Sequence, residues 1–565
     1  MSWRLGVIVA IIGLSTLAVT ARLFQLQVLD HPYYAAEARQ TRLREETVSS
    51  RRGSILDTNG YPLVISVDSY DVMVEKRAWS EPALAENAAR KLAEISGINP
   101  REAVETVINS QAYESAVARG LNYEQASQVR EARLPGVRLL ESSHRVYPEG
   151  SLAAQLIGFL GRDGQGLTGL EADMEKVLGG SKGELVIEKD GLGNDLFFGT
   201  RDETAPEPGS DIVLTIDRYI QRLAERELSE TIKKHEATGG SIIVLDAQTG
   251  AIRAMASQPS FDLTNPDLSD QSKLGLFRNR AITDQYEPGS VFKLVTVAAA
   301  LDAGLVSPGT WWNDTGVYDA GGWKIYNWDF SANGSQTVTQ LIAKSLNTGA
   351  AWLSSLLGPE RFYDYVHRFG FAQPTGVNLS GEVSGQVRTP QNDSDWRPVD
   401  LATNSFGQGL TATPLQMAMV VAAIANDGKL MKPYVVEEIV NDKQRQRIEP
   451  QVLGQVISAK TAQNVKQIMG VVVSGIPAYL LDVPRYSLGG KTGTANIAQG
   501  DGVYKPDSYI SSFAGVAPLG NPRLVVLVKI DEPKGVPWGT TVAAPAFGKI
   551  MKAALAYYNI PPDKE

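Results

Sequence analysis

The strongest constraint on the fold lies near the middle of the chain, in the segment 287–293, which reads Glu-Pro-Gly-Ser-Val-Phe-Lys. An apolar, Ala-rich run follows at 294–301. Pro and Gly ahead of such a run predict a turn that leads into a buried helix. Ser290 and Lys293 are three residues apart, so both would lie on one face at the helix N-terminus. There the unpaired backbone N–H groups and the positive end of the helix dipole favour negative charge.

A serine beside a lysine at this position suggests nucleophilic chemistry. A serine oxygen is a poor nucleophile until a neighbouring base takes its proton. Lys293 can be that base only if burial or a nearby like charge pulls its pKa down. The same pattern also fits an ordinary helix start, in which Ser290 caps the helix and the lysine extends to water. Taken alone, S-x-x-K does not decide between these interpretations.

Two later motifs favour the catalytic interpretation. Residues 345–347 read Ser-Leu-Asn, and residues 491–494 read Lys-Thr-Gly-Thr just ahead of a strongly β-like segment. S-x-x-K, S-x-N and K-T-G in this order are the motifs of penicillin-binding proteins and serine β-lactamases. We therefore interpret Ser290 as the nucleophile of an acyl-enzyme.

Composition excludes several other functions. The 565-residue chain is 43% hydrophobic and 21% charged, with a net charge of −9, which argues against a nucleic-acid partner. The absence of cysteine rules out disulfides, thiol catalysis and Cys-based metal sites. The four histidines, at positions 31, 144, 235 and 367, form no H-E-x-x-H pair. We expect neither a metal nor another cofactor.

The N-terminus carries an apolar run at 6–21 that continues, after Arg22, through 23–28. A spanning helix needs about 20 apolar residues. We predict a transmembrane anchor at 5–26 after a short cytoplasmic tail at 1–4. The alternative is a cleaved signal peptide, because Val-Thr-Ala at 19–21 resembles a cleavage site. Continuation of the apolar pattern beyond this point favours an uncleaved anchor.

We predict that residues 27–210 form a polar stalk and a mixed α+β domain, in which no set of catalytic residues is recognisable. Residues 201–210 are polar, contain two prolines and predict an extended linker. Arg52, Arg145 and Glu171 stand among Gly-rich turns and are either surface charges or paired groups that hold irregular loops. The elements expected from periodicity are strands at 63–76 and 137–147 and helices at 81–95 and 100–108.

We predict that residues 211–565 form the catalytic domain. A β-hairpin is expected at 241–256, ahead of the nucleophile helix, and a second strand pair at 509–517 and 523–530, after K-T-G-T. These pairs imply one antiparallel sheet built from both ends of the domain. Between them the chain is mostly helical, with helices expected at 359–369 and 414–426.

The chain resembles the class B penicillin-binding proteins, and among them the division-specific penicillin-binding protein 3 type. The resemblance runs nearly end to end and includes R-G-x-I-x-D-x-N-G at 52–60, R-x-Y-P-x-G at 145–150 and Ser-Phe-Gly-Gln-Gly at 405–409. S-x-N, in place of S-x-D, favours the division type. Leu346 replaces the usual small polar residue of that motif, and we expect it to line the cleft and to alter antibiotic spectrum.

The resemblance implies an α+β fold: a transpeptidase domain with an antiparallel sheet flanked by helices, on an elongated α+β pedestal, with one N-terminal transmembrane helix. It also implies a D,D-transpeptidase that cross-links peptidoglycan stem peptides and is acylated by β-lactams. Ser290 would attack the D-Ala–D-Ala carbonyl, and the backbone N–H groups of Ser290 and Thr494 would form the oxyanion hole. The remaining site residues implied are Lys293 as base, Ser345 as proton relay, Asn347 as a holder of Lys293 and substrate, and Lys491, Thr492, Gly493 and Thr494 at the substrate or β-lactam carboxylate.

The resemblance further implies a single-pass protein of the cytoplasmic membrane with a periplasmic catalytic domain. A lipid-linked glycan polymerase of the SEDS type and other division proteins would be its partners. A β-lactamase or D,D-carboxypeptidase shares the three motifs, and an idle scaffold of the division machinery is a further alternative. A P-loop nucleotide binder is excluded, because its motif requires glycine where this chain has Arg485.

Overall fold

A computed structural model describes residues 2–48, 50–161, 163–188, 196, 201–498 and 504–564. The chain forms two compact units, and each draws on separate stretches of sequence. The first unit comprises Met1–Gly53, Asp68–Ser143 and Gly179–Gly209, and the second comprises Ser54–Val67, His144–Leu178 and Ser210–Glu565.

The first unit begins with the expected apolar helix. α1 (Ser2–Phe24) continues through a π-helical turn at Gln25–Leu29 and is followed by α2 (His31–Arg42). The stretch Trp3–Leu29 is long and apolar enough to cross a membrane, and none of its most apolar window is buried. The apolar N-terminal helix expected from the sequence is confirmed.

A three-stranded sheet of order β1-β6-β7 follows, in the described part of the chain. Its strands are β1 (Leu43–Val48), β6 (Gly183–Glu188) and β7 (Arg201–Thr204), and both pairs are antiparallel. The extended linker expected at 201–210 is therefore wrong for its first four residues. β7 is exposed along its whole length, so backbone pairing with β6 holds it as a strand without any apolar signal in its sequence.

The rest of the first unit is a small α+β body. Its core contains Val72, Val74, Trp79, Ala89 and Leu92. The second half of β3 pairs antiparallel with β4 along one side of this core. The four elements expected from periodicity are confirmed as β3 (Pro62–Glu75), α3 (Pro82–Ser96), α4 (Pro100–Asn109) and β5 (Val137–Val146). Two further elements, β4 (Glu114–Leu121) and α5 (Tyr123–Ala132), were not expected from the sequence.

The second unit is organised on an antiparallel sheet, which in the described residues has five strands in the order β10-β9-β21-β20-β19. The hairpin predicted before the nucleophile and the strand pair predicted after K-T-G-T lie side by side in it, as β9 pairs with β21. The sheet expected from both ends of the domain is confirmed. Its strands are β9 (Gly239–Asp246), β10 (Ile252–Gln258), β19 (Gly489–Ala498), β20 (Tyr504–Ala517) and β21 (Leu524–Asp531).

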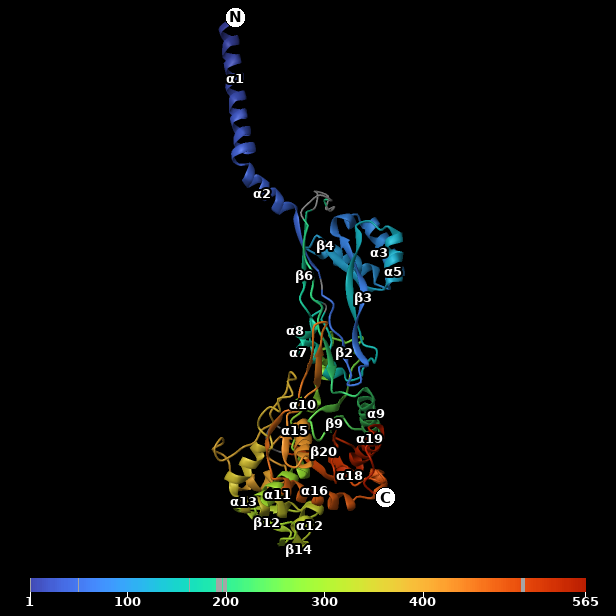
Figure 1. The fold of residues 1–565 in the computed structure, drawn as a ribbon, viewed down its shortest axis with the longest axis vertical. Helices are drawn as coiled ribbons and strands as arrows, with labels where there is room; N and C mark the ends of the chain where they lie inside the picture. Colours follow the sequence, from blue (N-terminus) through green and yellow to red (C-terminus); the bar gives the residue numbers. More distant parts are fainter. Residues whose placement is uncertain are drawn as a thin grey trace. The chain divides into compact units, whose positions relative to one another are not determined.

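Helices cover both faces of this sheet, which explains why β9 is an unbroken apolar run. Ile242 and Val244 pack into one core cluster with α9 (Arg218–Lys234) and α19 (Ala544–Tyr557), whereas Ile243 packs into the other, with the opposite helices. Figure 1 shows α9 and α19 on one side of β9 and α15 on the other. The helices of the second face are α11 (Lys293–Asp302), α13 (Asn347–Arg368), α15 (Pro414–Ala425) and α16 (Ala459–Ser474).

α11 is the buried helix predicted after the 287–293 segment. Every residue from Lys293 to Leu301 is buried, which fits a helix that is apolar on all sides and packs against α13 and α16. α13 has a non-helical residue at Gly358, immediately before Pro359, where the sequence predicted a helix start.

The remaining elements complete the second unit around this core. The helices are α6 (Ala154–Ile157), α7 (Gly169–Asp173), α8 (Glu175–Leu178), α10 (Arg280–Thr283), α12 (Val338–Ala343), α14 (Pro398–Asn404), α17 (Ala478–Leu481) and α18 (Gly539–Val542). The strands are β2 (Ile55–Leu56), β8 (Asp211–Leu214), β11 (Trp311–Asp314), β12 (Val317–Ala320), β13 (Trp323–Tyr326), β14 (Gly334–Thr337), β15 (Lys429–Met431), β16 (Val436–Val440), β17 (Arg445–Arg447) and β18 (Val452–Gln455).

Arg145 and Glu171 form a buried ion pair in the second unit. Nε of Arg145 donates to Oε1 of Glu171 at 2.7 Å, and its Nη1 donates to the hydroxyl of Ser66 at 2.9 Å. Their side chains are 5% and 0% exposed, so they are not surface charges. Of the two interpretations left open by the sequence, pairing that holds an irregular region is confirmed for these two residues. Breaking such a buried pair costs about 3–5 kcal/mol.

Candidate active site

Ser290 lies in a tight turn that precedes the nucleophile helix. Gly289–Phe292 forms one 3₁₀ turn, and the α-helix itself begins at Lys293. The sequence predicted that Ser290 would start the α-helix, and this is wrong by three residues. The turn still places Ser290 and Lys293 at the N-terminal end of α11, and Ser290 lines a cleft of about 570 Å³.

The serine turn is clamped by two neighbouring segments that approach it through glycines. The N–H of Gly289 donates to the carbonyl oxygen of Gly407 at 3.0 Å. A Cβ at Gly407, where φ is +79°, would lie 2.3 Å from the carbonyl oxygen of Gly289. On the other side, a Cβ at Gly493 would lie 3.0 Å from the carbonyl oxygen of Pro288. Only glycine permits the first approach, because the atom in the way belongs to the backbone.

Lys293 is fully buried, with no exposed surface, beneath the serine turn. Its Nζ donates to the carbonyl oxygen of Ser345 at 2.6 Å, to Oδ1 of Asn347 at 2.8 Å and to the hydroxyl of Ser345 at 3.2 Å. Burial, and secondarily the charge of Lys491, hold the pKa of Lys293 well below its ordinary value. These three oxygen acceptors match the three N–H donors that Lys293 has when it is a charged ammonium group. When Lys293 is neutral, the Ser345 hydroxyl can donate to its lone pair instead.

Lys491 approaches the same serine from β19. Its Nζ donates to the hydroxyl of Ser345 at 3.0 Å and to its neighbour's carbonyl oxygen, that of Thr492, at 3.1 Å. The side chain is 1% exposed, and burial lowers the pKa of Lys491 to about 7. A lysine with this pKa can carry charge when an anion is bound and release a proton when none is.

Ser345 is held in a backbone conformation that L-residues rarely adopt. It lies between α12 and α13 with φ at +58°. Strained residues of this kind persist where the surroundings fix them, and they occur often at functional sites. Here the conformation directs the Ser345 hydroxyl to both lysines and its carbonyl oxygen to Lys293 alone.

Ser290 makes no side-chain hydrogen bond to Lys293, nor to any other part of the chain that the structure describes. The side-by-side placement expected from the sequence therefore involves no hydrogen bond in the unliganded protein. Catalytic hydrogen bonds are often open in unliganded enzymes and close in the substrate complex.

Asn347 is fixed through a buried polar cluster behind the cleft. Its Nδ2 donates to the carbonyl oxygen of Tyr326 at 3.1 Å. The hydroxyl oxygen of the next residue, Thr348, lies within hydrogen-bond distance of two acceptors: Oδ1 of Asn327 at 2.9 Å and the buried carboxylate of Asp314 at 3.0 Å. No local pattern in the sequence marks this cluster, because its members come from three separate segments.

The K-T-G-T strand supplies the other wall of the cleft. Thr492 and Thr494 line it, and Gly493 gives the close approach to the serine turn. The hydroxyl of Thr494 accepts the N–H of Gly539 at 3.2 Å, which ties the strand to the segment at the start of α18. The structure thus brings together all eight of the site residues expected from the sequence.

Aromatic residues that the sequence did not single out line the same cleft. Trp328 and Trp538 lie edge to face with ring centres 5.3 Å apart, one from the loop after β13 and the other from the residue before α18. Phe406 also lines the cleft, and its ring centre is 6.0 Å from Nζ of Lys293. Phe406 belongs to the Ser-Phe-Gly-Gln-Gly motif, whereas no local pattern marks the two tryptophans, because they converge only in three dimensions.

Glu287 ties two cleft segments to the serine turn. Its carboxylate accepts the N–H of Gly409 at 2.9 Å and the hydroxyl of Tyr504 at 3.1 Å. Burial raises the pKa of Glu287 above its ordinary value.

Leu346 does not line the cleft: it is 2% exposed and belongs to the hydrophobic core. The expectation that Leu346 lines the cleft is wrong, because the strained turn at Ser345 directs it inward.

Comparison with known proteins gives the family. The model of the penicillin binding protein transpeptidase domain matches residues 240–552, and that of the penicillin-binding protein dimerisation domain matches residues 47–214. The chain belongs to the class B penicillin-binding proteins. Within the described residues of this penicillin-binding protein, no three His, Cys, Asp or Glu side chains lie close enough to hold a metal ion.

Relatives and solved structures agree with this assignment. The peptidoglycan D,D-transpeptidase FtsI of Escherichia coli (strain K12) is 33% identical over 100% of this penicillin-binding protein and 93% of its own length. Stage V sporulation protein D of Bacillus subtilis (strain 168) is 33% identical, over 97% and 84% respectively. The aztreonam complex of penicillin binding protein 3 from Mycobacterium tuberculosis is similar with a TM-score of 0.70 and 29% identity, covering 92% of this chain and 98% of that one.

Proposed function

We propose that this protein is a serine-type peptidoglycan D,D-transpeptidase that cross-links stem peptides in septal cell-wall synthesis and is inactivated by β-lactams. The observation that carries the proposal is the convergence of two buried lysines on one hydroxyl beside the nucleophile: Lys293 and Lys491 both contact Ser345. Relatives named as peptidoglycan D,D-transpeptidases support it.

In the acylation step, Lys293 takes the proton of the Ser290 hydroxyl as the oxygen attacks the D-Ala–D-Ala carbonyl. The lowered pKa of Lys293 supports this role, because only a neutral amine accepts a proton. Backbone N–H groups of Ser290 and Thr494 stabilise the oxyanion. Ser345 passes a proton to the amine of the departing D-Ala, and an ester on Ser290 remains.

In the second step, the amine of a neighbouring stem peptide attacks the ester and forms the cross-link. A proton from that amine returns to the Ser290 oxygen through the Ser345 and Lys293 pair, which restores the free enzyme. Lys491, together with the Thr492 and Thr494 hydroxyls, binds the substrate or β-lactam carboxylate, and Gly493 lets this strand approach. An anion beside Lys491 raises its pKa and keeps it charged.

We also propose the arrangement of the chain in the cell. Residues 1–4 form a cytoplasmic tail and 5–26 the anchor in the cytoplasmic membrane. Residues 27–210 form a non-catalytic pedestal, and 211–565 form the periplasmic transpeptidase domain. The apolar helix α1 and the match of the dimerisation-domain model support this division. A SEDS-type glycan polymerase and other division proteins are the proposed partners, bound through anchor and pedestal.

A carboxypeptidase would transfer the stem-peptide acyl group to water, and a β-lactamase would transfer the acyl group of an opened β-lactam to water. Purified protein should be given a donor stem peptide ending in D-Ala–D-Ala, with or without an acceptor amine, and the products separated by mass spectrometry. We expect a new amide bond that depends on the acceptor. Release of the shortened donor alone would identify a carboxypeptidase, and rapid turnover of penicillin would identify a β-lactamase.

The nucleophile is tested by Ser290→Ala with a fluorescent penicillin. The variant should fold with at most about 0.5–2 kcal/mol of destabilisation, the range for losing a helix-start hydroxyl. It should form no covalent adduct, since no other oxygen replaces Ser290. Ser405→Ala is the matched control, because that hydroxyl is fully buried and donates within its own segment. An adduct mapped to another residue of the Ser290→Ala protein would contradict the proposal.

A further inference from the structure

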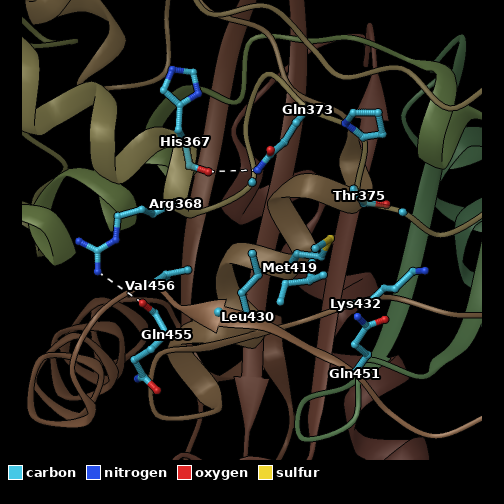
Figure 2. Close-up of a pocket in the computed structure, with 15 residues that line it drawn as sticks. His367, Arg368, Gln373, Thr375, Met419, Leu430, Lys432, Gln451, Gln455 and Val456 are labelled. Carbon is cyan, nitrogen blue, oxygen red and sulfur yellow. Dashed lines mark hydrogen bonds between the residues drawn. The ribbon is translucent and has the colours of Figure 1, made fainter.

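A second cavity lies in the same unit as the catalytic cleft and shares no described lining residue with it. It has a volume of about 530 Å³ and lies between the C-terminal end of α13, α15 and the two-stranded sheet of β15 and β18. Figure 2 shows Met419 and Leu430 near its middle, with Arg368 on one side and Lys432 on the other. We name it the Arg368–Lys432 groove.

The groove continues into a smaller neighbouring cavity. That cavity has a volume of about 260 Å³ and shares the lining residues Gly376, Lys432 and Gln451 with the groove. Two adjoining cavities suit an extended chain, which advances about 3.3 Å per residue, better than a single compact molecule.

One wall of the groove is an unpaired strand edge. Among the described strands, β18 pairs with β15 alone, so its other edge has no partner strand. Leu453, Gly454 and Gln455 of β18 line the groove, and the side chains of Val452 and Leu453 are 52% and 47% exposed. Proteins usually protect free edges with charges or bulges, because exposed backbone groups recruit another strand.

The charges at the groove are positive in a protein of net charge −9. Arg368 and Lys432 line the main cavity, and no carboxylate does so among the described residues. Glu449 lines the adjoining cavity and forms no ion pair with either cation. The Lys432 ammonium makes no hydrogen bond or ion pair within the described chain. Arg368 stacks on Tyr365 with 4.6 Å to the ring centre and donates to the carbonyl oxygen of Gln455 at 3.4 Å.

Nearby carboxylates do not neutralise these cations. Asp364 lies 3.8 Å from Arg368 with a side chain that is 64% exposed, and such surface pairs contribute about 0–1 kcal/mol. Glu382 is occupied by the Thr375 backbone N–H, at 2.7 Å, and by its hydroxyl. The groove therefore offers an apolar floor, a free strand edge and two cations with spare N–H groups.

We propose that the Arg368–Lys432 groove binds an extended acidic segment of a partner protein, which pairs with the free edge of β18 and places carboxylates against Arg368 and Lys432. Strand addition supplies main-chain hydrogen bonds, and the pocket over Met419 and Leu430 accepts an apolar side chain. Charge complementarity selects the acidic partner, because a basic segment would bring like charges together.

The test selects short random peptides on the full-length protein in detergent micelles. Ser290 is first acylated with benzylpenicillin, so that the catalytic cleft cannot capture peptides. We expect the selected peptides to be rich in Asp and Glu around one apolar residue. Their affinity should fall at least about tenfold in Lys432→Glu and in Arg368→Glu, as expected for losing one charge-assisted contact.

Lys91→Glu is the matched control, since it makes the same charge change on an exposed position of α3. It should leave peptide affinity unchanged, and all three variants should still be acylated by penicillin, which reports correct folding. A selection that yields no binder, yields no acidic preference, or yields peptides insensitive to Lys432→Glu overturns the proposal.

Strand pairing is tested separately with the selected peptide methylated at alternate backbone nitrogens. The methylated peptide should lose binding, because it cannot donate to β18. Retained affinity would overturn the strand-addition part. The alternative occupant of the groove is a second copy of this chain, and sedimentation of the protein without peptide tests it. A dimer that Lys432→Glu converts to a monomer would assign the groove to that second copy and would overturn the proposal of an acidic partner protein.

Discussion

Lys293 and Lys491 direct their side-chain nitrogens at one oxygen, the hydroxyl of Ser345, at 3.2 and 3.0 Å. Both side chains are buried, and burial is the largest cause of the lowered pKa of each. Two ammonium groups this close would repel each other strongly in a buried site. The pair is therefore best occupied by fewer than two charges, and Ser345 can carry a proton between its members.

Replacing Lys293 by arginine tests the base role. Arginine keeps the positive charge and its donors, but it does not release its proton at any accessible pH. Lys293→Arg should fold and should slow penicillin acylation by at least about 10²-fold, the lower end for the loss of a general base. Stopped-flow acylation with a chromogenic β-lactam measures it. A rate within about tenfold of the parent would show that the residue serves only as a charge, since a lost base costs about 10²-fold or more.

The pH dependence of acylation reports the coupling of the two lysines. Acylation requires neutral Lys293, so the rate at saturating β-lactam should fall as pH decreases through its pKa. Charge on Lys491 helps to lower that pKa, and a bound carboxylate keeps Lys491 charged. Lys491→Gln should therefore move the acidic limb to higher pH. An unmoved limb, or one displaced to lower pH, would contradict the coupling.

The same lysines give a pH dependence to stability. The pKa of Lys491 is about 7 in the folded protein, below the value of about 10.4 for an unfolded lysine. Between these values the unfolded chain binds more protons, so the contribution of Lys491 to the free energy of unfolding should increase as pH rises from about 7 to about 10.4. Denaturant unfolding of the parent and of Lys491→Met should be measured across this range. The free energy of unfolding of Lys491→Met minus that of the parent should decrease as pH rises, and a difference that does not change with pH would contradict the prediction.

The clamp on the serine turn is tested by a pair of glycine substitutions. Gly407→Ala places a Cβ 2.3 Å from the Gly289 carbonyl oxygen, whereas Gly409→Ala meets only side-chain atoms at 3.1 Å or more, and both have positive φ. Backbone strain of about 1 kcal/mol is common to both. Gly407→Ala alone should displace Ser290 and slow acylation by at least about 10²-fold, the cost of a misplaced reacting group. Equal acylation rates in the two variants would show that the contact does not position Ser290.

The anchor is tested by the mature N-terminus and by truncation. Full-length protein from membranes should need detergent and retain residues 6–21, because the stretch Trp3–Leu29 is long and apolar enough to cross a membrane. A chain shortened to begin at Gln40 should be soluble and should still react with penicillin, since the catalytic residues lie in a separate compact unit. Sequencing a mature end at Arg22 would instead identify a cleaved signal peptide.

The sequence by itself determined the elements whose signals are local. Short β-like runs bounded by turns identified β9, β10, β20 and β21 of the central sheet, and Pro and Gly ahead of an Ala-rich run located α11. S-x-x-K, S-x-N and K-T-G-T indicated the eight candidate catalytic and substrate-binding residues, because each motif places its side chains within a single turn or strand. The strand β7 was not predicted, because it is held by pairing with a partner strand and its own sequence has no apolar pattern.

Only the tertiary structure decided how the motifs act together. The two lysines meet at Ser345 because its backbone adopts φ at +58°, and no local signal in Ser-Leu-Asn predicts that conformation. The same turn buries Leu346, which the motif alone placed in the cleft. Trp328 and Trp538 meet across the cleft although 210 positions separate them in the chain. Such contacts depend on the packing of distant segments, whose geometry is set by the whole core and not by neighbouring residues.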